Sequence, residues 1–131
     1  MDDKKGFTLI EVMIVGAFAA LLVVLFFIQK ASVDAMNRDD KRRIAINAMY
    51  YALEEYYAPL HDGYYPAEIS EKNLPVIDPK LFTDPFGIVL GTDGSSYSYE
   101  AANCNADNEC SEYILRAQLE EEDVYIQKGK R

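Results

Sequence analysis

The chain has 131 residues and carries 22 acidic against 13 basic side chains, which gives a formal net charge of −9. Nearly all of the excess negative charge lies after Pro59, and such an acidic distal part argues against direct binding to nucleic acid. The length predicts one domain in addition to an apolar N-terminal segment, so the part beyond that segment is small.

The sequence lacks the motifs that common catalytic and nucleotide-binding sites require. It has no nucleophile elbow, no glycine-rich phosphate loop and no paired histidines, since His61 is the single histidine. The many tyrosines are better interpreted as sheet-packing and surface residues than as reactive groups. We therefore expect no enzymatic activity and no resident cofactor.

An apolar run covers residues 7–28. Thr8 and Glu11 are the only polar side chains in it. As an α-helix this run would be roughly 33 Å long, which is enough to cross a bilayer. Glu11 is exceptional because a carboxylate deep in an apolar segment is costly, and such residues usually mark function.

The residues around this run predict how it sits in a membrane. Lys4 and Lys5 precede it, and basic residues on that side favour an N-terminus that stays in the cytoplasm. The run is too long for the core of a secretory signal, and no Ala-x-Ala-type cleavage site follows it. We therefore expect a single-pass anchor with the N-terminus inside and the C-terminus outside, which the mature protein keeps.

The stretch Gly6-Phe7-Thr8-Leu9-Ile10-Glu11, with its basic flank and long apolar run, resembles the type IV prepilin signature. Type IV pilins and the pseudopilins of type II secretion share this signature. The resemblance implies a leader peptide of residues 1–6, which a membrane peptidase removes by cutting between Gly6 and Phe7. It also implies methylation of the new N-terminus at Phe7 and a filament core helix over residues 7–28.

In the processed chain Glu11 becomes the fifth residue, and we hypothesise that it acts in assembly. An unpaired buried charge costs several kcal/mol, whereas pairing with the Phe7 amine of a neighbouring copy removes that cost only in the assembled state. The resemblance implies a structural subunit of a type IV pilus or a type II secretion pseudopilus. The alternative is a membrane-anchored extracytoplasmic binding module on an ordinary signal anchor, which does not polymerise.

The resemblance also implies partners and a location. The partners are further copies of the chain, other pilins or pseudopilins, the prepilin peptidase and the inner-membrane assembly platform. The chain would first reside in the cytoplasmic (inner) membrane and later in an extracytoplasmic filament. One departure is that many type IV pilins have a proline late in the apolar run, whereas residues 25–28 contain none. Gly16 is the only helix-weakening residue in the run.

Residues 29–58 predict an amphipathic continuation of the same helix beyond the membrane. The segment contains no proline or glycine and is rich in helix-forming residues. Apolar residues recur at three- and four-residue steps, which predicts a stripe that packs on a sheet. The stripe comprises Ile46, Met49, Leu53, Tyr56 and Leu60. A neighbouring row of small residues, for which subunit contact is a second use, comprises Ala45, Ala48 and Ala52.

The stretch Asp39-Asp40-Lys41-Arg42-Arg43 places charges of both signs just beyond the predicted membrane segment. It is either a solvated helix face or a surface that pairs with neighbouring copies in a filament. Pro59 and the pair Asp62-Gly63 are expected to end the helix.

Residues 59–131 predict a globular domain that joins a connecting loop to an antiparallel sheet. Four prolines between residues 63 and 90 exclude long regular elements there, although one short helix is expected near residues 67–72. The stretch Asp84-Pro85-Phe86-Gly87 is typical of a turn and resembles a turn of major pseudopilins. The expected strands cover residues 88–90, 97–99, 113–119 and 124–126. The predicted fold class is α+β, with a long N-terminal helix on a small sheet.

Cys104 and Cys110 are the only cysteines. Outside the cytoplasm an even pair at this spacing indicates a disulfide that closes a hairpin loop. Two cysteines are too few for a structural zinc site, and His61 is distant in sequence.

Oxygen-bearing side chains also gather around this loop, at Asn103, Asn105, Asp107 and Glu109. They are weak candidates for Ca²⁺ ligands, since some major pseudopilins bind calcium in their C-terminal loops. Their spacing does not match an EF-hand, and acidic surface loops are common.

Overall fold

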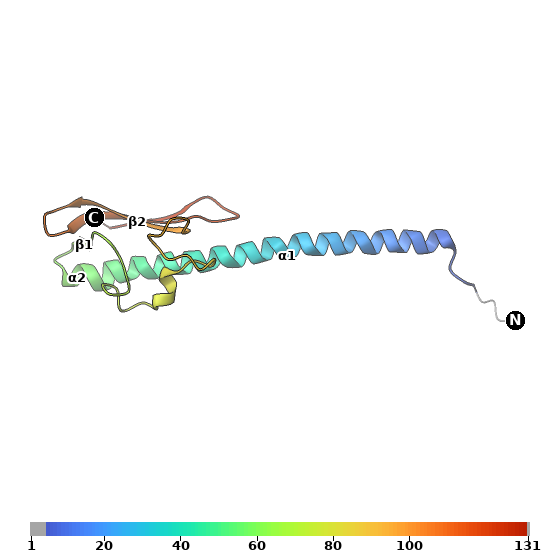
Figure 1. Cartoon of the computed structure of the whole chain (residues 1–131), viewed down its shortest axis with the longest axis horizontal. Helices are drawn as coiled ribbons and strands as arrows, with labels where there is room; N and C mark the ends of the chain where they lie inside the picture. Colours follow the sequence, from blue (N-terminus) through green and yellow to red (C-terminus); the bar gives the residue numbers. More distant parts are fainter. Residues whose placement is uncertain (1–4, 131) are drawn as a thin grey trace. The chain divides into compact units, whose positions relative to one another are not determined.

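The structure is a computed structural model that describes residues 5–130 (Figure 1). Positions 1–4, which form most of the predicted leader, and position 131 lie outside the described residues. The chain divides into two compact units, Met1–Asp34 and Ala35–Arg131. The first unit contributes the N-terminal part of one long helix, and the second contains the rest of that helix and a sheet.

The long helix runs without interruption past the apolar segment. It begins as α1 (Leu9–Tyr51), continues as a π-helical segment, η1 (Ala52–Tyr57), and finishes as α2 (Ala58–Leu60). The predicted continuation over residues 29–58 is therefore confirmed. The lack of a proline in residues 25–28 agrees with the regular helix observed there.

The helix ends just after the predicted proline rather than at it. Pro59 lies inside α2, where its fixed backbone angle fits the start of a helical turn. Asp62 and Gly63 then adopt positive φ angles of 55° and 84°. The amide of Gly63 donates to the carbonyl of Ala58 at 2.7 Å, which closes the last turn.

The segment η1 changes which residues of the helix face the core. Ile46, Met49 and Leu53 are fully buried, as the predicted stripe requires. A π-helical turn holds about one residue more than an α-helical turn, so the buried face moves along the sequence after Leu53. Ala58 is consequently buried, whereas Leu60 is 66% exposed. The prediction that the stripe continues to Leu60 is therefore wrong.

One antiparallel sheet packs beside the helix. Its strands are β1 (Tyr65–Pro66), β2 (Tyr97–Cys104), β3 (Glu109–Ala117) and β4 (Tyr125–Lys128). The central strand is β3, with β2 along one side. On its other side β3 pairs with β1 near its start and with β4 near its end. The strands predicted around residues 97–99, 113–119 and 124–126 are thus confirmed, with shifted bounds.

The connecting loop differs from its prediction in two places. Residues 67–72 form turns rather than a helix, because the side chain of Asn73 accepts from the Ser70 amide at 2.8 Å and donates to the Glu68 carbonyl at 2.7 Å. A short 3₁₀ helix, η2 (Pro79–Phe82), forms further along, with Asp78 as its N-cap.

The strand predicted over residues 88–90 is also absent. An isolated bridge between Thr83 and Val89 is its only ladder contact in the part of the chain that the structure describes. Gly87 and Gly91 flank it with φ angles of 84° and 86°, a conformation that ends extended structure on both sides.

The core of the second unit lies between the helix and the sheet. From the sheet, Tyr97, Tyr113 and Leu115 are buried against the helix. Ala45 and Ala52 are buried in the same cluster, so these two members of the alanine row serve the core. The observed architecture is an α+β fold with one long helix and a small antiparallel sheet.

Candidate functional site

The predicted processing and assembly residues lie at the start of α1. Gly6 and Phe7 precede the helix, and Thr8 occupies the position just before its first residue. The Thr8 hydroxyl accepts from the Glu11 amide at 3.3 Å, which is the bond an N-cap threonine makes. Glu11 thus lies in the first helical turn, where the helix dipole favours a negative charge. The capping spacing of Thr8 and Glu11 is a signal that our interpretation of the sequence did not use.

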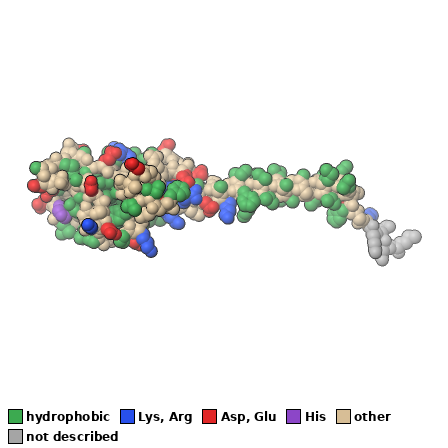
Figure 2. Space-filling model, in the orientation of Figure 1, with side chains coloured by type: hydrophobic (Ala, Val, Ile, Leu, Met, Phe, Trp, Pro, Cys, Tyr) green, Lys and Arg blue, Asp and Glu red, His purple; other side chains and the backbone are tan. Residues whose placement is uncertain are grey.

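The apolar run exposes its side chains on all sides of the helix. The large hydrophobic residues of the run range from 47% exposure at Leu25 to 80% at Leu9. Figure 2 shows hydrophobic side chains gathered along this part of the helix. By length and composition the helix can cross a membrane. Such a surface is stable only against lipid or other apolar helices, because water solvates it poorly.

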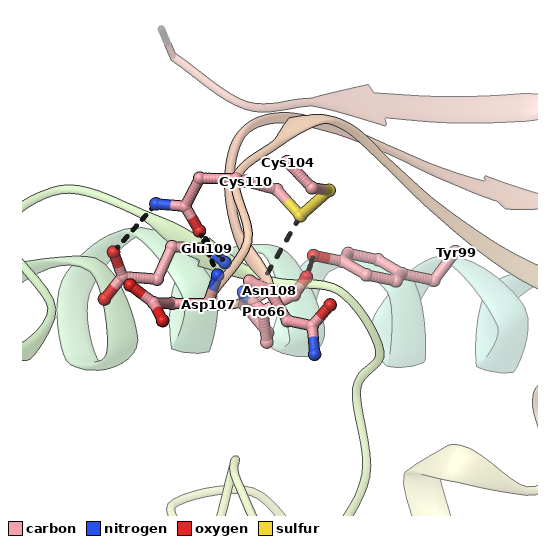
Figure 3. Close-up of a disulfide and its surroundings, with 8 residues drawn as sticks. Pro66, Tyr99, Cys104, Asp107, Asn108, Glu109 and Cys110 are labelled. Carbon is pink, nitrogen blue, oxygen red and sulfur yellow. Dashed lines mark hydrogen bonds between the residues drawn. A yellow bond between two sulfur atoms is a disulfide. The ribbon is translucent and has the colours of Figure 1, made fainter.

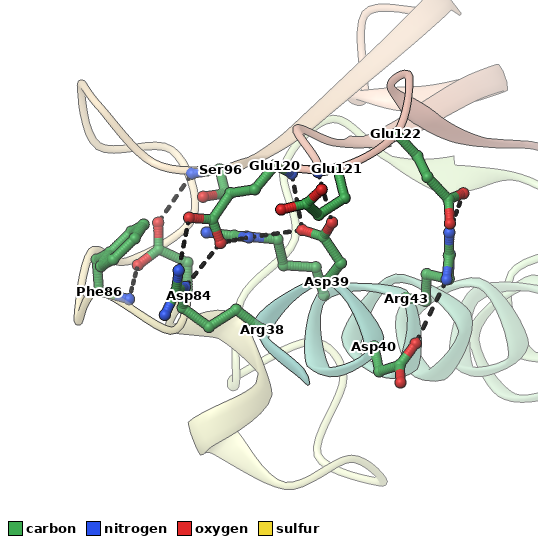
Figure 4. A network of polar contacts seen from close by, with 11 residues as sticks. Arg38, Asp39, Asp40, Arg43, Asp84, Phe86, Ser96, Glu120, Glu121 and Glu122 are labelled. Atoms are coloured by element: carbon green, nitrogen blue, oxygen red, sulfur yellow. Dashed lines mark hydrogen bonds and ion pairs between the residues drawn. The ribbon is translucent and has the colours of Figure 1, made fainter. Parts of the chain in front are cut away.

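In the second unit, part of the predicted charge cluster is buried. Asp39 and Arg42 are 2% and 1% exposed, and the guanidinium of Arg42 donates to the Asp39 carboxylate at 2.8 Å. Asp39 also accepts from the backbone amides of Glu120 at 2.8 Å and Glu121 at 2.9 Å (Figure 4). The buried Asp39 therefore holds the segment after β3 against the helix, which the side chains of a solvated helix face would not do.

The carboxylate of Glu120 completes this network. It accepts two hydrogen bonds from Arg38, at 2.7 and 2.9 Å, and one from Arg42 at 2.8 Å. The hydrogen bonds from Arg38 and then Arg42 lower the pKa of Glu120 to about 2. Burial alone would raise the pKa of Asp39, but the two backbone amides and Arg42 outweigh it and hold that pKa below its usual value. Both carboxylates are therefore ionised at neutral pH.

The predicted Asp84 turn is confirmed, and it packs against the same network. The amide of Gly87 donates to the Asp84 carbonyl at 2.9 Å, which closes the turn. The buried Asp84 carboxylate accepts from the amides of Phe86, Ile88 and Ser96 at 2.9–3.0 Å. The guanidinium groups of Arg38 and Arg42 lie 5.5 and 5.3 Å from the centre of the Phe86 ring.

A second, partly buried cluster forms around Glu54 on η1. Its carboxylate accepts from the hydroxyls of Tyr65 and Tyr113 at 2.9–3.1 Å and from the Lys130 amide at 3.1 Å. Burial and the adjacent Glu54 carboxylate raise the pKa of Tyr113 above its usual value. The β-carbon of any other residue at Gly129 would lie 2.9 Å from the Tyr113 ring, so glycine is needed there. Sequence periodicity gave no signal for this cluster.

The predicted disulfide is present. Cys104 and Cys110 are directly opposite each other on β2 and β3 and are covalently joined (Figure 3). Between them the amide of Asn105 donates to the Glu109 carbonyl at 2.9 Å. The Asn105 side chain in turn accepts from the amides of Asp107 and Glu109 at 2.9 and 3.0 Å. The hairpin loop is therefore closed by its own hydrogen bonds as well as by the disulfide.

Of the weak calcium candidates, Asp107 lies in this loop and Glu109 is the first residue of β3 beside it (Figure 3). The carboxylate of Glu109 already accepts from the side-chain amide of Asn105 at 3.2 Å. Across residues 5–130, no group of three or more acidic, cysteine or histidine side chains is placed to hold a metal ion. The geometry gives the calcium hypothesis no support.

Comparison with known proteins yields no match: no family model, curated protein or solved structure corresponds to this chain.

Proposed function

We propose that the chain is a structural subunit that is held in a membrane by its N-terminal helix and polymerises through that helix into a filament. The filament is a type IV pilus or a type II secretion pseudopilus. Before assembly a prepilin peptidase removes residues 1–6, and Phe7 becomes the methylated N-terminus. Each copy then contributes its apolar helix to the filament interior and its sheet domain to the surface.

The position of Glu11 carries this proposal. It is the one carboxylate on a helical surface that is otherwise apolar and exposed from Leu9 to Ile28. Lipid alone would leave that carboxylate unpaired at a cost of several kcal/mol. A bundle of such helices, offset along the filament, brings the Phe7 amine of one copy to Glu11 of another. The pairing supplies a countercharge and also fixes the offset.

The second unit supports an extracytoplasmic role. Disulfides form and persist outside the reducing cytoplasm, and the Cys104–Cys110 bond closes an exposed hairpin. Ion pairs, the Glu54 cluster and this disulfide all tie the ends of short strands to the helix or to each other. A domain displayed on a filament requires such reinforcement because its core is small.

Processing is tested by co-expressing the full chain with a prepilin peptidase and measuring the mass of the product. We expect loss of six residues and addition of one methyl group at Phe7. A Gly6→Leu variant, with a large side chain at the cleavage junction, should remain uncleaved. An intact N-terminus in the unchanged chain would favour the signal-anchor alternative.

Assembly is tested by the Glu11→Gln substitution. The variant should insert into the membrane and be cleaved normally, because length and apolarity are unchanged, but its yield of sheared filaments should fall at least about tenfold. The matched control is Asp34→Asn, which neutralises an exposed carboxylate outside the apolar run and should assemble normally. Normal filaments from Glu11→Gln would contradict the assembly role.

One observation favours the alternative of an anchored binding module. The connecting loop contains a cavity of about 340 Å³ lined by apolar side chains that include Ile69, Phe82 and Leu90. This volume lies at the lower end of the range for small-molecule sites. A binding module of that kind does not require Glu11. Binding of a small molecule in this cavity, together with an absence of filaments, would favour the binding module over the filament subunit.

A further inference from the structure

The sheet has two edges with open backbone groups. β3 is paired on both sides, whereas β2 has β3 as its only strand partner among the described residues. β4 likewise pairs with β3 alone. An edge strand exposes a row of N–H and C=O groups on which another strand can form.

The hydrogen-bond pattern identifies which groups are open. The amide of Gln118 donates to the carbonyl of Ser96, so the residues of β2 that bond to β3 are Ser96 and every second residue after it. Because bonded positions alternate in an antiparallel ladder, Tyr99 and Ala101 direct their N–H and C=O groups to the outer edge. On the β4 side, the amide of Gly129 donates to the Tyr113 carbonyl, so Gly129 and every second residue before it bond to β3. There the open groups belong to Ile126 and Lys128.

The β2 edge has little of the protection that edge strands usually carry. It contains no proline and no lysine, and its register with β3 runs without a bulge from Tyr97 to Ala102. Glu100 is its single charged residue; the Glu100 side chain is 64% exposed and forms an ion pair with Arg116 of β3 at 2.8 Å. Asn103, with a φ angle of 54°, interrupts the ladder after Ala102, so the regular edge from Tyr97 to Ala102 is the part suited to pairing with a further strand.

We propose that the β2 edge of one copy pairs with the β4 edge of a second copy, so that the sheet continues from subunit to subunit. β2 and β4 are both antiparallel to β3 and so run in the same direction, which makes the new ladder parallel for copies of one orientation. This inference rests on the proposed filament, since a contact between two different edges does not close on itself and propagates.

Charge favours the occupant that this proposal names. Glu100 and Lys128 flank Ile114 in one row across the sheet, so both side chains project from the same face. Pairing β2 with β4 brings Glu100 of one copy near Lys128 of the next. Pairing two β2 edges in the register centred on Glu100 would set two like charges against each other, and like charges on facing strands are destabilising.

Cysteine cross-linking tests the contact in the full-length, membrane-anchored chain. Within one chain, positions 100 and 128 are two strand spacings apart, about 10 Å, which is too far for a disulfide. A chain with both Glu100→Cys and Lys128→Cys should therefore form a ladder of linked multimers on mild oxidation. Combining Glu100→Cys with Ile126→Cys covers a register shifted by one outward-facing position. Glu100→Cys paired with Asp107→Cys, which is exposed but off the β4 edge, should give no ladder.

A blocking variant makes the test specific. Ala101→Pro removes an N–H that the chain itself does not use, so the domain should stay folded while the ladder disappears. Its urea midpoint, compared with that of the unchanged chain, verifies the fold. Dimers from Glu100→Cys alone would overturn the proposal in favour of β2–β2 pairing.

Filaments and cross-links are scored separately. Filaments without a ladder in either register would overturn the sheet contact and leave the proposed function standing. A ladder in membranes that produce no filaments would support the contact and contradict the proposed function. The absence of both would contradict each of them.

Discussion

Residues 9–28 and residues 35–60 belong to one continuous helix, yet their side chains meet opposite surroundings. In the first segment every large hydrophobic side chain is exposed, and no residue is buried. In the second segment Ile46, Met49 and Leu53 are fully buried, and even the charged pair Asp39 and Arg42 is enclosed. The two segments of this helix therefore have separate tasks.

The difference shows where each segment obtains its stability. The second segment is stabilised within the chain by apolar burial and by hydrogen bonds and ion pairs that hold it to the segment after β3. The first has no such contacts in the described structure and requires an apolar environment from outside, whether lipid or neighbouring helices. Substitutions of one residue type in the two segments should consequently have different effects.

The largest contrast is expected between two leucines. Leu53→Ala should lower the free energy of unfolding of the sheet domain by about 3 kcal/mol, because it leaves a cavity at a fully buried site. Leu22→Ala, at a site that is 52% exposed, should leave that free energy unchanged. Urea unfolding of the full chain in detergent, followed by near-UV circular dichroism of the tyrosines, measures both. Equal losses would show that the two segments are not energetically distinct.

A smaller contrast is expected between two neighbouring aspartates. Asp39→Asn should cost about 2 kcal/mol, because it removes the charge from three hydrogen bonds inside the domain. Asp40→Asn should cost at most about 0.5 kcal/mol, since its pair with Arg43 is exposed and 3.4 Å long. The same unfolding measurement compares them. A cost for Asp40→Asn that matches Asp39→Asn would mean that burial does not set the strength of these pairs.

Much of this organisation could be predicted from the sequence because it depends on local patterns. The apolar run and the absence of helix breakers predict the long helix. Alternating side chains predict β3, with Tyr113, Leu115 and Ala117 on its buried face. The Cys104–Cys110 bond followed from the spacing of the two cysteines.

Features that depend on distant contacts could not be predicted in the same way. Asp39 and Asp40 are adjacent and chemically identical, yet Asp39 is buried and accepts from backbone amides after β3, whereas Asp40 pairs with Arg43 at the surface. The π-helical segment is equally hidden, since Ala52–Tyr57 has the composition of an ordinary helix. The sequence marks Glu11 as the exception in its apolar run. It does not identify the partner of Glu11, because in our proposal that partner lies on another copy of the chain.

The smallest expected effect concerns stability in acid, to which the second segment should respond and the first should not. The pKa of Glu120 is about 2 in the folded chain against its usual value of 4.5, because Arg38 and Arg42 bind its ionised form. A lowered pKa means that this carboxylate stabilises the fold above about pH 4.5 and loses that contribution as the pH falls towards 2. Between about pH 4.5 and pH 2, the free energy of unfolding of the domain should therefore fall less in Glu120→Gln than in the unchanged chain. Helicity of residues 9–28 in detergent should not respond to this substitution. Unfolding midpoints recorded from pH 6 down to about pH 2 test this, and an unchanged acid profile in Glu120→Gln would exclude the Glu120 network as its source.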